Sequence, residues 1–277
     1  MSLQAKAVAF QRLHAENPPL ILPNPWDAGS ARLLTAMGFK ALATTSAGLA
    51  FSLGVKDSAG MLTRAQVLEN AANIVDATSL PVSADLENGF GDSPEDVAQT
   101  IRMAAEAGLV GGSIEDASGE KYHPIYDFNH ALERIQAGVE AARTLPFPFT
   151  FVARAENFSV GRCDLDDTIR RLQAFEKAGA DVLYAPALPT LEAIRMVCAE
   201  VQRPINVVIG FGGIAFSVAE LADVGVRRIS LGSSLARAAL GGLVRAAQEI
   251  QQKGTFEFVA ETITFAEVND LMAPSNE

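Results

Sequence analysis

Four carboxylates stand near the ends of three successive strand-like segments, and their types and spacing are those of a cation site. Asp85 and Glu87 are two residues apart after an apolar run, so an extended backbone would project both to the same side. Asp57 lies in the loop after the preceding strand-like run, and Glu115 ends the following one. Oxygen-only ligands suit Mg²⁺ or Mn²⁺, and Mg²⁺ keeps several waters, so one direct carboxylate is sufficient. We predict a Mg²⁺ site, with Mn²⁺ as the alternative metal; taken alone, the Asp85 and Glu87 pair also fits an acidic helix start or loop.

Strand-like and helix-like segments alternate along the chain, which predicts the elements that hold these acids. The expected strands are 20–24, 40–46, 81–86, 111–116, 149–156, 181–186, 204–210 and 227–232. Helical periodicity lies between them, as over 64–77 and 94–107. Thr63 with Gln66 fits a capping box at the start of the first of these helices. Strict alternation with apolar, β-branched strands is typical of a parallel sheet that is covered on both faces.

The number of repeating units predicts a closed sheet. Eight strand–helix units in about 240 residues favour a (β/α)₈ TIM barrel over an open doubly wound sheet, which is the alternative. No Gly-x-Gly-x-x-Gly follows the first strand, so dinucleotide binding has no support. We expect residues 1–277 to form a single barrel domain with an extra C-terminal helical tail from about 250, including a helix over 265–272. Acids at the carboxyl ends of the strands would then share one mouth.

Composition and charge limit the partners and the compartment. The chain has 277 residues, 49% of them hydrophobic, which predicts a large core. Its formal net charge is −11 and it has no basic cluster, so nucleic acid is not an expected partner. The first residues do not resemble a signal peptide, and no apolar run is long enough to span a bilayer. We expect a cytoplasmic protein with no membrane contact and with both cysteines reduced.

Two further features suit an anionic substrate. Arg154 ends the fifth expected strand in an apolar context, where a guanidinium must find an anion. Recognition of a substrate carboxylate or phosphonate is one interpretation, and structural pairing with Glu156 or with the acid cluster is the other. The second expected strand ends in the small-residue turn Thr-Thr-Ser-Ala-Gly over 44–48, whose backbone N–H groups are suited to a carboxylate.

Six segments in combination resemble those of the isocitrate lyase and phosphoenolpyruvate mutase superfamily, from about residue 20 to about residue 240. They are NPWDAGSARLL, TTSAGLAFSLGVKDS, ADLENGFGD, GGSIED, AR-x-E and VAELADVGVRRISLG. Their order and combination are specific, whereas any one segment is not. Within the superfamily the chain resembles a carboxyphosphonoenolpyruvate phosphonomutase-like member that has no catalytic-cysteine loop.

The resemblance implies a (β/α)₈ barrel with Mg²⁺ and a small α-oxo acid or its enolate in the mouth. It also implies a homotetramer, built as a dimer of dimers that exchange the last barrel helix. Asp85 would be the direct metal ligand, with Asp57, Glu87 and Glu115 holding metal-bound waters. In the same way the resemblance assigns the substrate carboxylate to Ser46, Ala47 and Gly48, a pocket wall to Trp26, and substrate oxygens to Arg154.

The chain departs from the superfamily in the segment DASGEKYHPIYDFNH, which follows the fourth expected strand. Lyases that act on isocitrate or methylisocitrate carry a Lys-Lys-Cys-Gly-His loop, which is absent, and Cys163 and Cys198 fall elsewhere. The Lys-x-Asn-Ser loop of phosphonopyruvate-type members is absent too. His123 lies in this segment and is a candidate catalytic acid or base, with an exposed loop histidine as the alternative.

Enolate stabilisation is the chemistry that these residues favour. We expect a Mg²⁺-dependent carbon–carbon lyase that acts on a small α-oxo or 2-hydroxy di- or tricarboxylic acid, with decarboxylation of oxaloacetate as the simplest case. The alternatives are phosphorus–carbon bond chemistry of the phosphonopyruvate hydrolase or phosphoenolpyruvate mutase type, and a non-catalytic α-oxo acid binding protein.

Overall fold

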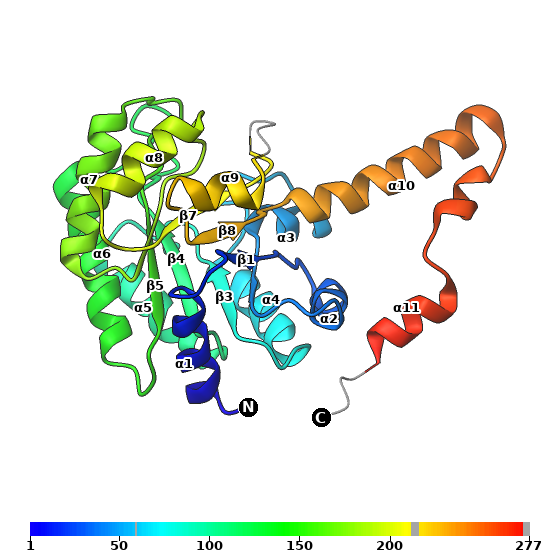
Figure 1. Ribbon diagram of the computed structural model, residues 1–277, viewed down its shortest axis with the longest axis horizontal. Helices are drawn as coiled ribbons and strands as arrows, with labels where there is room; N and C mark the ends of the chain where they lie inside the picture. Colours follow the sequence, from blue (N-terminus) through cyan, green and yellow to red (C-terminus); the bar gives the residue numbers. More distant parts are fainter. Residues whose placement is uncertain (59, 212–215, 274–277) are drawn as a thin grey trace.

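Eight parallel strands curl into a barrel in the computed structural model, which describes residues 1–58, 60–211 and 216–273 (Figure 1). The strands are β1 (Leu20–Leu22), β2 (Leu42–Ala43), β3 (Val82–Asp85), β4 (Gly111–Glu115), β5 (Thr150–Arg154), β6 (Val182–Tyr184), β7 (Ile205–Val208) and β8 (Arg228–Ser230). Their order in the sheet is β1-β8-β7-β6-β5-β4-β3-β2. Ala43 N–H at β2 donates to the Pro23 carbonyl after β1 at 3.1 Å, which links the two outer strands. The predicted (β/α)₈ barrel is confirmed, and the open sheet is not formed.

Helices cover the outside of the barrel, and others lie before and after the repeating units. They are α1 (Leu3–Leu13), α2 (Ala28–Ala36), α3 (Ser46–Ser52), α4 (Arg64–Asp76), α5 (Pro94–Glu106), α6 (Phe128–Arg143), α7 (Leu165–Ala178), α8 (Leu191–Glu200), α9 (Val218–Asp223), α10 (Ser234–Lys253) and α11 (Phe265–Met272), with the 3₁₀ helix η1 (Glu257–Glu261). The capping box of Thr63 and Gln66 begins α4 as predicted. Gly179 ends α7 in the left-handed region, at φ 105°, and turns the chain into β6.

The observed strands are shorter than the expected ones, and the largest difference has a local cause. We predicted that the second strand runs over 40–46, but β2 ends at Ala43 and α3 begins at Ser46. The side chain of Thr45 accepts a hydrogen bond from Gly48 N–H at 3.2 Å, so it caps a helix where the small-residue run suggested continued strand. Ser46 therefore lies in the first turn of a helix at the barrel mouth.

The core fills the layer between the strands and the surrounding helices. Helix α6 approaches β5 closely because Gly138 has no side chain: a Cβ there would lie 2.6 Å from the ring of Phe151. Helices α5 and α6 pack side by side against the sheet (Figure 1). Helix α1 contributes Phe10, which is fully buried. This packing fixes the strand ends that carry the predicted site.

The C-terminal helices have a different environment. Helix α10 projects away from the barrel (Figure 1), and Ala236 is its only buried residue. The chain then returns, so that α11 lies against α2, where Arg32 Nη1 donates to the Met272 carbonyl at 3.2 Å. Helix α11 spans the residues predicted for the last helix. In the described ranges, no helix has the length and apolar character needed to cross a membrane.

Candidate active site

A cavity of about 760 Å³ opens at the carboxyl ends of the strands β3 to β5, and it gathers the predicted acids. Its lining includes Asp57, Asp85, Glu87, Glu115, Ser46 and Arg154. Asp85, Glu115 and Arg154 are the last residues of β3, β4 and β5, so the parallel barrel itself brings them together. The structure therefore unites all four predicted metal-site carboxylates with the predicted substrate-binding arginine.

Arg154 forms the centre of this cluster. Its Nη1 donates to Asp85 Oδ1 at 3.0 Å, its Nη2 lies 3.1 Å from Glu115 Oε2, and its Nε donates to Glu156 Oε1 at 2.7 Å. The guanidinium carbon also lies 4.8 Å from the centroid of the Tyr184 ring. Burial opposes its charge, but the neighbouring carboxylates hold the pKa of Arg154 well above its usual value. Pairing with Glu156 and the acid cluster, one of the two interpretations from sequence, is therefore present.

Asp85 is held on both of its oxygens. Oδ1 accepts from Arg154, and Oδ2 accepts from the hydroxyl of Ser46 at 2.9 Å. Its backbone N–H donates to Thr44 Oγ1 at 3.1 Å, so the end of β3 is tied to the chain that follows β2. These bonds orient the carboxylate before any ligand arrives.

The other three acids, Asp57, Glu87 and Glu115, have raised pKa values because too little positive charge lies near them. Burial, then the charges of Asp85 and Asp57, raise the pKa of Glu87 to about 7. Burial also raises the pKa of Glu115 well above its usual value although Arg154 opposes this, and burial with Asp85 raises that of Asp57. One guanidinium does not neutralise this many carboxylates, so the cluster has the charge and the oxygen donors of a divalent cation site.

The spacing of the acids bears on how an ion would be held. Within the described residues, no three His, Cys, Asp or Glu side chains lie close enough together to hold a metal ion directly. A Mg²⁺ ion that binds one carboxylate and keeps its waters does not need such a group. The residues present therefore fit the predicted arrangement, in which Asp85 is the anchor and the remaining acids contact water.

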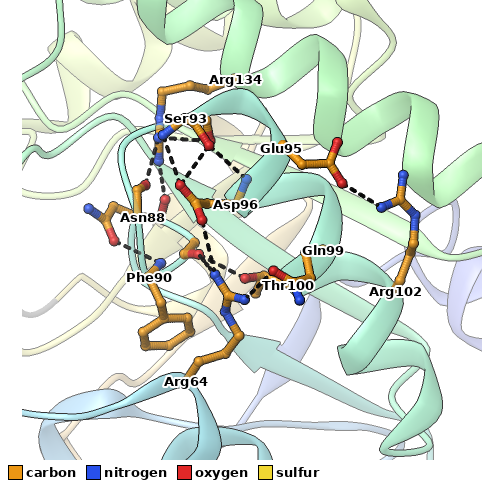
Figure 2. A network of polar contacts seen from close by, with 12 residues as sticks. Arg64, Asn88, Phe90, Ser93, Glu95, Asp96, Gln99, Thr100, Arg102 and Arg134 are labelled. Carbon is orange, nitrogen blue, oxygen red and sulfur yellow. Dashed lines mark hydrogen bonds and ion pairs between the residues drawn. The ribbon is translucent and has the colours of Figure 1, made fainter.

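Two arginines from helices α4 and α6 hold the loop that carries Glu87, and the first of them, Arg64, also lines the cavity. Figure 2 shows Arg134 of α6 and Arg64 of α4 directed at residues 88–93. Arg134 donates to the carbonyls of Gly91, at 2.7 Å, and of Asn88, while Arg64 Nη2 donates to the Gly89 carbonyl at 3.3 Å. Glu87 has φ 48°, a left-handed conformation that a side chain disfavours, so the loop needs such external contacts to keep its shape.

Arg134 also connects this loop to the segment that follows β4. Its guanidinium carbon lies 4.3 Å from the centroid of the Tyr126 ring. The Tyr126 hydroxyl donates to Asp92 Oδ1 at 2.6 Å and accepts from Asn88 Nδ2 at 3.1 Å. Sequence reasoning missed Arg134, but a signal was present: it lies three or four residues from Ala131 and Gly138 on the buried face of α6.

A second, buried ion pair, between Asp116 and Arg171, fixes the chain just after the ends of β4 and β5. Asp116 accepts from the backbone N–H of Glu156 at 2.7 Å and from Arg171 Nη1 at 2.9 Å. Burial raises the pKa of Asp116 to about 6 although Arg171 opposes the shift. Glu156 in turn accepts from the hydroxyl of Ser159. These contacts fix the position of the Glu156 carboxylate, which accepts from Arg154 Nε. Neither Tyr184 nor Asp116 was predicted from the sequence as part of the site.

Two predicted substrate-binding residues line a different cavity. Trp26 and Gly48 border an apolar space of about 200 Å³ together with Leu240 and Leu243 of α10. A Cβ on Gly48 would lie 2.9 Å from the Cβ of Trp26, and the Gly48 N–H is already donated to Thr45. Ala47 lies between Ser46 and Gly48 in the first turn of α3. Their roles stay predictions, with Ser46 the member that reaches the acid cavity.

The remaining candidates lie away from the acids. His123 is exposed in the segment 119–127, and its carbonyl accepts from the hydroxyl of Ser118. Cys163 is exposed, while Cys198 lines another cavity, of about 450 Å³, near the N-terminal ends of β6 and β7. Burial raises the pKa of the Cys198 thiol to about 11. The described residues that line the acid cavity include no cysteine and no histidine.

Comparisons with known proteins identify the family of the chain. A family model described as phosphoenolpyruvate phosphomutase matches residues 10–251. The 2-methylisocitrate lyase of Escherichia coli K12 is 32% identical over 95% of this chain and 90% of its own length. A crystal structure of a putative lyase/mutase from Burkholderia cenocepacia is 53% identical with a TM-score of 0.96, covering 99% of this chain and 97% of that one. A 2,3-dimethylmalate lyase structure is 26% identical with a TM-score of 0.85, covering 97% and 95%. These similarities and the site at the barrel mouth show that the chain belongs to the phosphoenolpyruvate phosphomutase family, within the isocitrate lyase and phosphoenolpyruvate mutase superfamily.

Proposed function

We propose that the protein is a Mg²⁺-dependent lyase that cleaves a carbon–carbon bond of a small α-oxo or 2-hydroxy acid. One observation carries the proposal: the cavity gathers four carboxylates of which only Asp85 and Glu115 pair with Arg154, and burial with mutual repulsion raises the pKa of Asp57, Glu87 and Glu115. A site of this kind is completed by a divalent cation, and the cation gives an acidic protein a means of holding an anionic substrate.

Asp85 is the residue that would hold Mg²⁺ directly, and Asp57, Glu87 and Glu115 would hold its waters. The ion supplies Lewis-acid chemistry, which withdraws charge from a substrate oxygen. Mn²⁺ accepts the same oxygen donors and is expected to substitute. The bonds from Ser46 and Arg154 keep the Asp85 carboxylate in one orientation for this role.

Arg154 is the residue that we assign to the reacting oxygens. Its side chain lies in the cavity and is buried among carboxylates, so its charge is not screened by bulk water. Donation from its guanidinium to an oxygen that gains negative charge as an enolate forms would lower the barrier of bond cleavage. Ser46, whose hydroxyl donates to Asp85, and the neighbouring Ala47 are assigned to the substrate carboxylate.

The absence of a thiol among the described lining residues favours a cleavage that needs no cysteine acid. Decarboxylation of oxaloacetate or a related 2-oxo dicarboxylate meets that requirement, because loss of CO₂ leaves only an enolate to stabilise. A catalytic role for His123 would require the segment 119–127 to bring its imidazole to the cavity, where Ala117, Gly119 and Glu120 already form part of the lining.

Phosphorus–carbon chemistry is the second candidate function. The family model and a putative phosphonomutase structure from Burkholderia cenocepacia, 36% identical over 90% of this chain, favour it. Cleavage or transfer of a phosphoryl group on a pyruvyl unit also passes through an enolate, so the same acids and Arg154 would serve both reactions.

A turnover panel tests these proposals. The purified protein with Mg²⁺ is given oxaloacetate, 2-methylisocitrate, 2,3-dimethylmalate or phosphonopyruvate, and pyruvate is measured together with CO₂, succinate, propionate or phosphate. Interconversion of phosphonopyruvate with phosphoenolpyruvate, which releases no pyruvate, is followed by ³¹P NMR. We expect oxaloacetate to be turned over faster than with Mg²⁺ alone. Equal rates with and without protein would rule out the decarboxylase, and phosphate release would move the assignment to phosphorus–carbon cleavage.

The same panel addresses the non-catalytic alternative. A binding protein would be stabilised against heat by an α-oxo acid, for example oxalate or pyruvate, while every substrate stayed intact. Replacing Asp85 by Asn would then reduce the rise in Tm that the α-oxo acid causes, and no turnover would be seen in either protein.

We also propose that the protein assembles as a homo-oligomer in which α10 packs on a second copy. Helix α10 exposes Leu243, 66% accessible, and Val244, 51% accessible, on a helix that projects from the barrel. An apolar helix face of this length is unfavourable in water. Exchange of α10 between paired subunits, as the superfamily resemblance implies, would cover it and would close the cavity beside Trp26. Light scattering on the purified protein tests the assembly.

A further inference from the structure

The inside of the barrel is polar, whereas such barrels are usually filled with bulky branched apolar side chains. Ser83 of β3, Thr150 of β5, Asn206 of β7 and Arg228 of β8 are all buried. Each has a buried side-chain atom without a hydrogen-bond partner among the described residues: Ser83 Oγ, Thr150 Oγ1, Asn206 Oδ1 and Arg228 Nε. Buried polar atoms are normally paired, and two of these residues, Asn206 and Arg228, line one internal cavity, so their unpaired atoms point to an occupant there.

Among these residues Arg228 is the one that carries a charge, so leaving it unpaired costs the most free energy. It is 4% exposed, and its neighbours are Phe10, whose ring centroid is 5.8 Å from the guanidinium carbon, and His14, whose Nε2 is 3.4 Å from Nη1. Burial lowers the pKa of Arg228 to about 10, so it stays charged at neutral pH. Burial and Arg228 lower the pKa of His14 to about 3, so His14 is neutral there. No ion pair joins Arg228 to a carboxylate within the described ranges, and an uncompensated buried charge is costly.

A cavity beside Arg228 offers space for a counter-ion. It has a volume of about 50 Å³ and is lined by Arg228, Asn206, Tyr184, Ser230, Arg154 and Asp85, among others. Asp85 is the only carboxylate in the described lining, and it is already bound by Arg154 and Ser46. Arg154 is bound by Asp85, Glu115 and Glu156, so Arg228 is the one guanidinium of the described lining that has no carboxylate partner in the described ranges.

The polar groups of this cavity are suited to an anion. Arg228 Nε–H is an unused donor, and the Tyr184 hydroxyl can donate as well. Asn206 Nδ2 lies 3.0 Å from Ser230 Oγ. The amide oxygen and nitrogen of Asn206 have nearly the same shape, so the side chain can rotate by 180°. Ser230 Oγ then donates to Asn206 Oδ1, and the Asn206 NH₂ group faces the cavity. The lining then offers three donors to an anion, namely Arg228 Nε–H, the Tyr184 hydroxyl and the Asn206 amide.

We propose that this cavity holds a small monovalent anion of the size of chloride, bound by Arg228, Asn206 and Tyr184. The anion neutralises the charge inside the barrel and lies below the Asp85–Arg154 pair, so it is part of the folded core and not a substrate. Water would satisfy the unpaired atoms but would leave the charge of Arg228 uncompensated, which makes water the competing occupant.

Crystals grown from the full chain in sodium bromide provide the direct test. We expect an anomalous difference peak at the bromine absorption edge in the barrel interior, within hydrogen-bond distance of Arg228 Nε. A cavity that contains only water at the same bromide concentration would overturn the proposal, because bromide follows chloride closely in charge and size.

Stability provides a second readout. Thermal unfolding is compared in sodium chloride and in sodium gluconate, whose anion is too large for the cavity, at equal ionic strength. Above the dissociation constant, each tenfold rise in chloride should raise the Tm by about 2–5 °C. Equal Tm values in the two salts would contradict a bound anion.

Matched variants separate this site from general salt effects. Asn206→Asp places a carboxylate beside Arg228, its register partner in β8, so chloride dependence and the bromide peak should both be lost. Arg228→Met should lose them as well, at a lower Tm. Arg227→Met is the control: this neighbouring arginine contacts Asn17 outside the internal cavity, so the chloride dependence should be kept. Chloride dependence that survives in Asn206→Asp would overturn the proposal, even if Arg228→Met fails to fold.

Discussion

Arg154 Nη1 donates to Asp85 Oδ1 at 3.0 Å across the barrel mouth, although 69 residues separate the two in the chain. The pair joins the end of β3 to the end of β5 and unites the proposed metal anchor with the proposed substrate-binding cation. A ligand that engages either residue changes the charge that the other one faces. Metal and substrate are therefore expected to bind interdependently.

Replacing Asp85 by Asn is expected to remove metal-dependent turnover, with a loss in kcat/KM of at least about 100-fold. The amide keeps the shape of the side chain but loses the charge, so the rise in Tm on adding Mg²⁺ should also disappear. Steady-state kinetics and thermal unfolding with and without Mg²⁺ measure both effects. Asp76→Asn, which changes an exposed acid at the end of α4, is the control and should leave both unchanged. Wild-type Mg²⁺ dependence in the Asp85 variant would show that the anchor lies elsewhere.

Replacing Arg154 by Lys is expected to lower kcat/KM by about 10²–10³-fold while the protein still folds. One ammonium group cannot contact Asp85, Glu115 and Glu156 with the three nitrogens that the guanidinium uses. The kinetic loss should lie mainly in kcat if Arg154 contacts the oxygen that becomes charged. A change confined to KM would instead indicate that it only binds the substrate.

The stability of the metal-free protein should fall as the pH rises from about 4.5 toward about 7 and beyond, owing to Glu87. Its pKa is raised in the folded state, so its contribution is fully present below the unfolded pKa and is lost as the pH passes the folded value. Mg²⁺ favours the ionised carboxylates, so its stabilising effect should grow over the same range. Chemical unfolding at pH 5, 6, 7 and 8 with Mg²⁺ or EDTA checks this. Glu87→Gln should flatten the profile of the metal-free protein, and an unchanged profile would assign it to other groups.

Replacing Arg134 by Lys is expected to raise the Mg²⁺ concentration needed for half-maximal activity, with a smaller effect on the KM of the substrate. Arg134 is 1% exposed and donates to the carbonyls of Asn88 and Gly91, which fix the loop carrying Glu87. Arg134→Met should lower stability by about 2–4 kcal/mol, because it leaves buried carbonyls unpaired. Arg102→Lys is the control, since its pairing with Glu95 in Figure 2 is exposed. An equal loss of Mg²⁺ affinity in both variants would refute a positioning role for Arg134.

Replacing Leu243 by Glu is expected to dissociate the proposed oligomer, because it places a charge on the exposed face of α10. Size-exclusion chromatography with light scattering measures the mass of the particle. Gln251→Glu adds the same charge near the end of the helix at an exposed polar position and should leave assembly intact. A wild-type protein that elutes as a monomer would contradict the proposal directly.

Much of the fold followed from local sequence. Alternating apolar strands and periodic helices identified the eight units, and Thr63 and Gln66 located the start of α4, because capping and periodicity act over a few neighbouring residues. The end of β2 was predicted wrongly because one hydrogen bond, from Gly48 N–H to Thr45, decides between strand and helix there. Strand ends depend on such single contacts, which composition does not reveal.

The sequence by itself determined which residues are the candidates for the chemistry and the architecture that gathers them: acids at the ends of successive strands of a parallel barrel must share one mouth. Only the tertiary structure decided how they meet, because Arg154 reaches Asp85, Glu115 and Glu156 through a geometry set by three strands. It also decided that Trp26 and Gly48 border α10 instead of the acids, and that Arg228 is buried without a carboxylate partner in the described ranges. Long-range contacts of this kind arise from packing, and residue spacing in one dimension does not encode them.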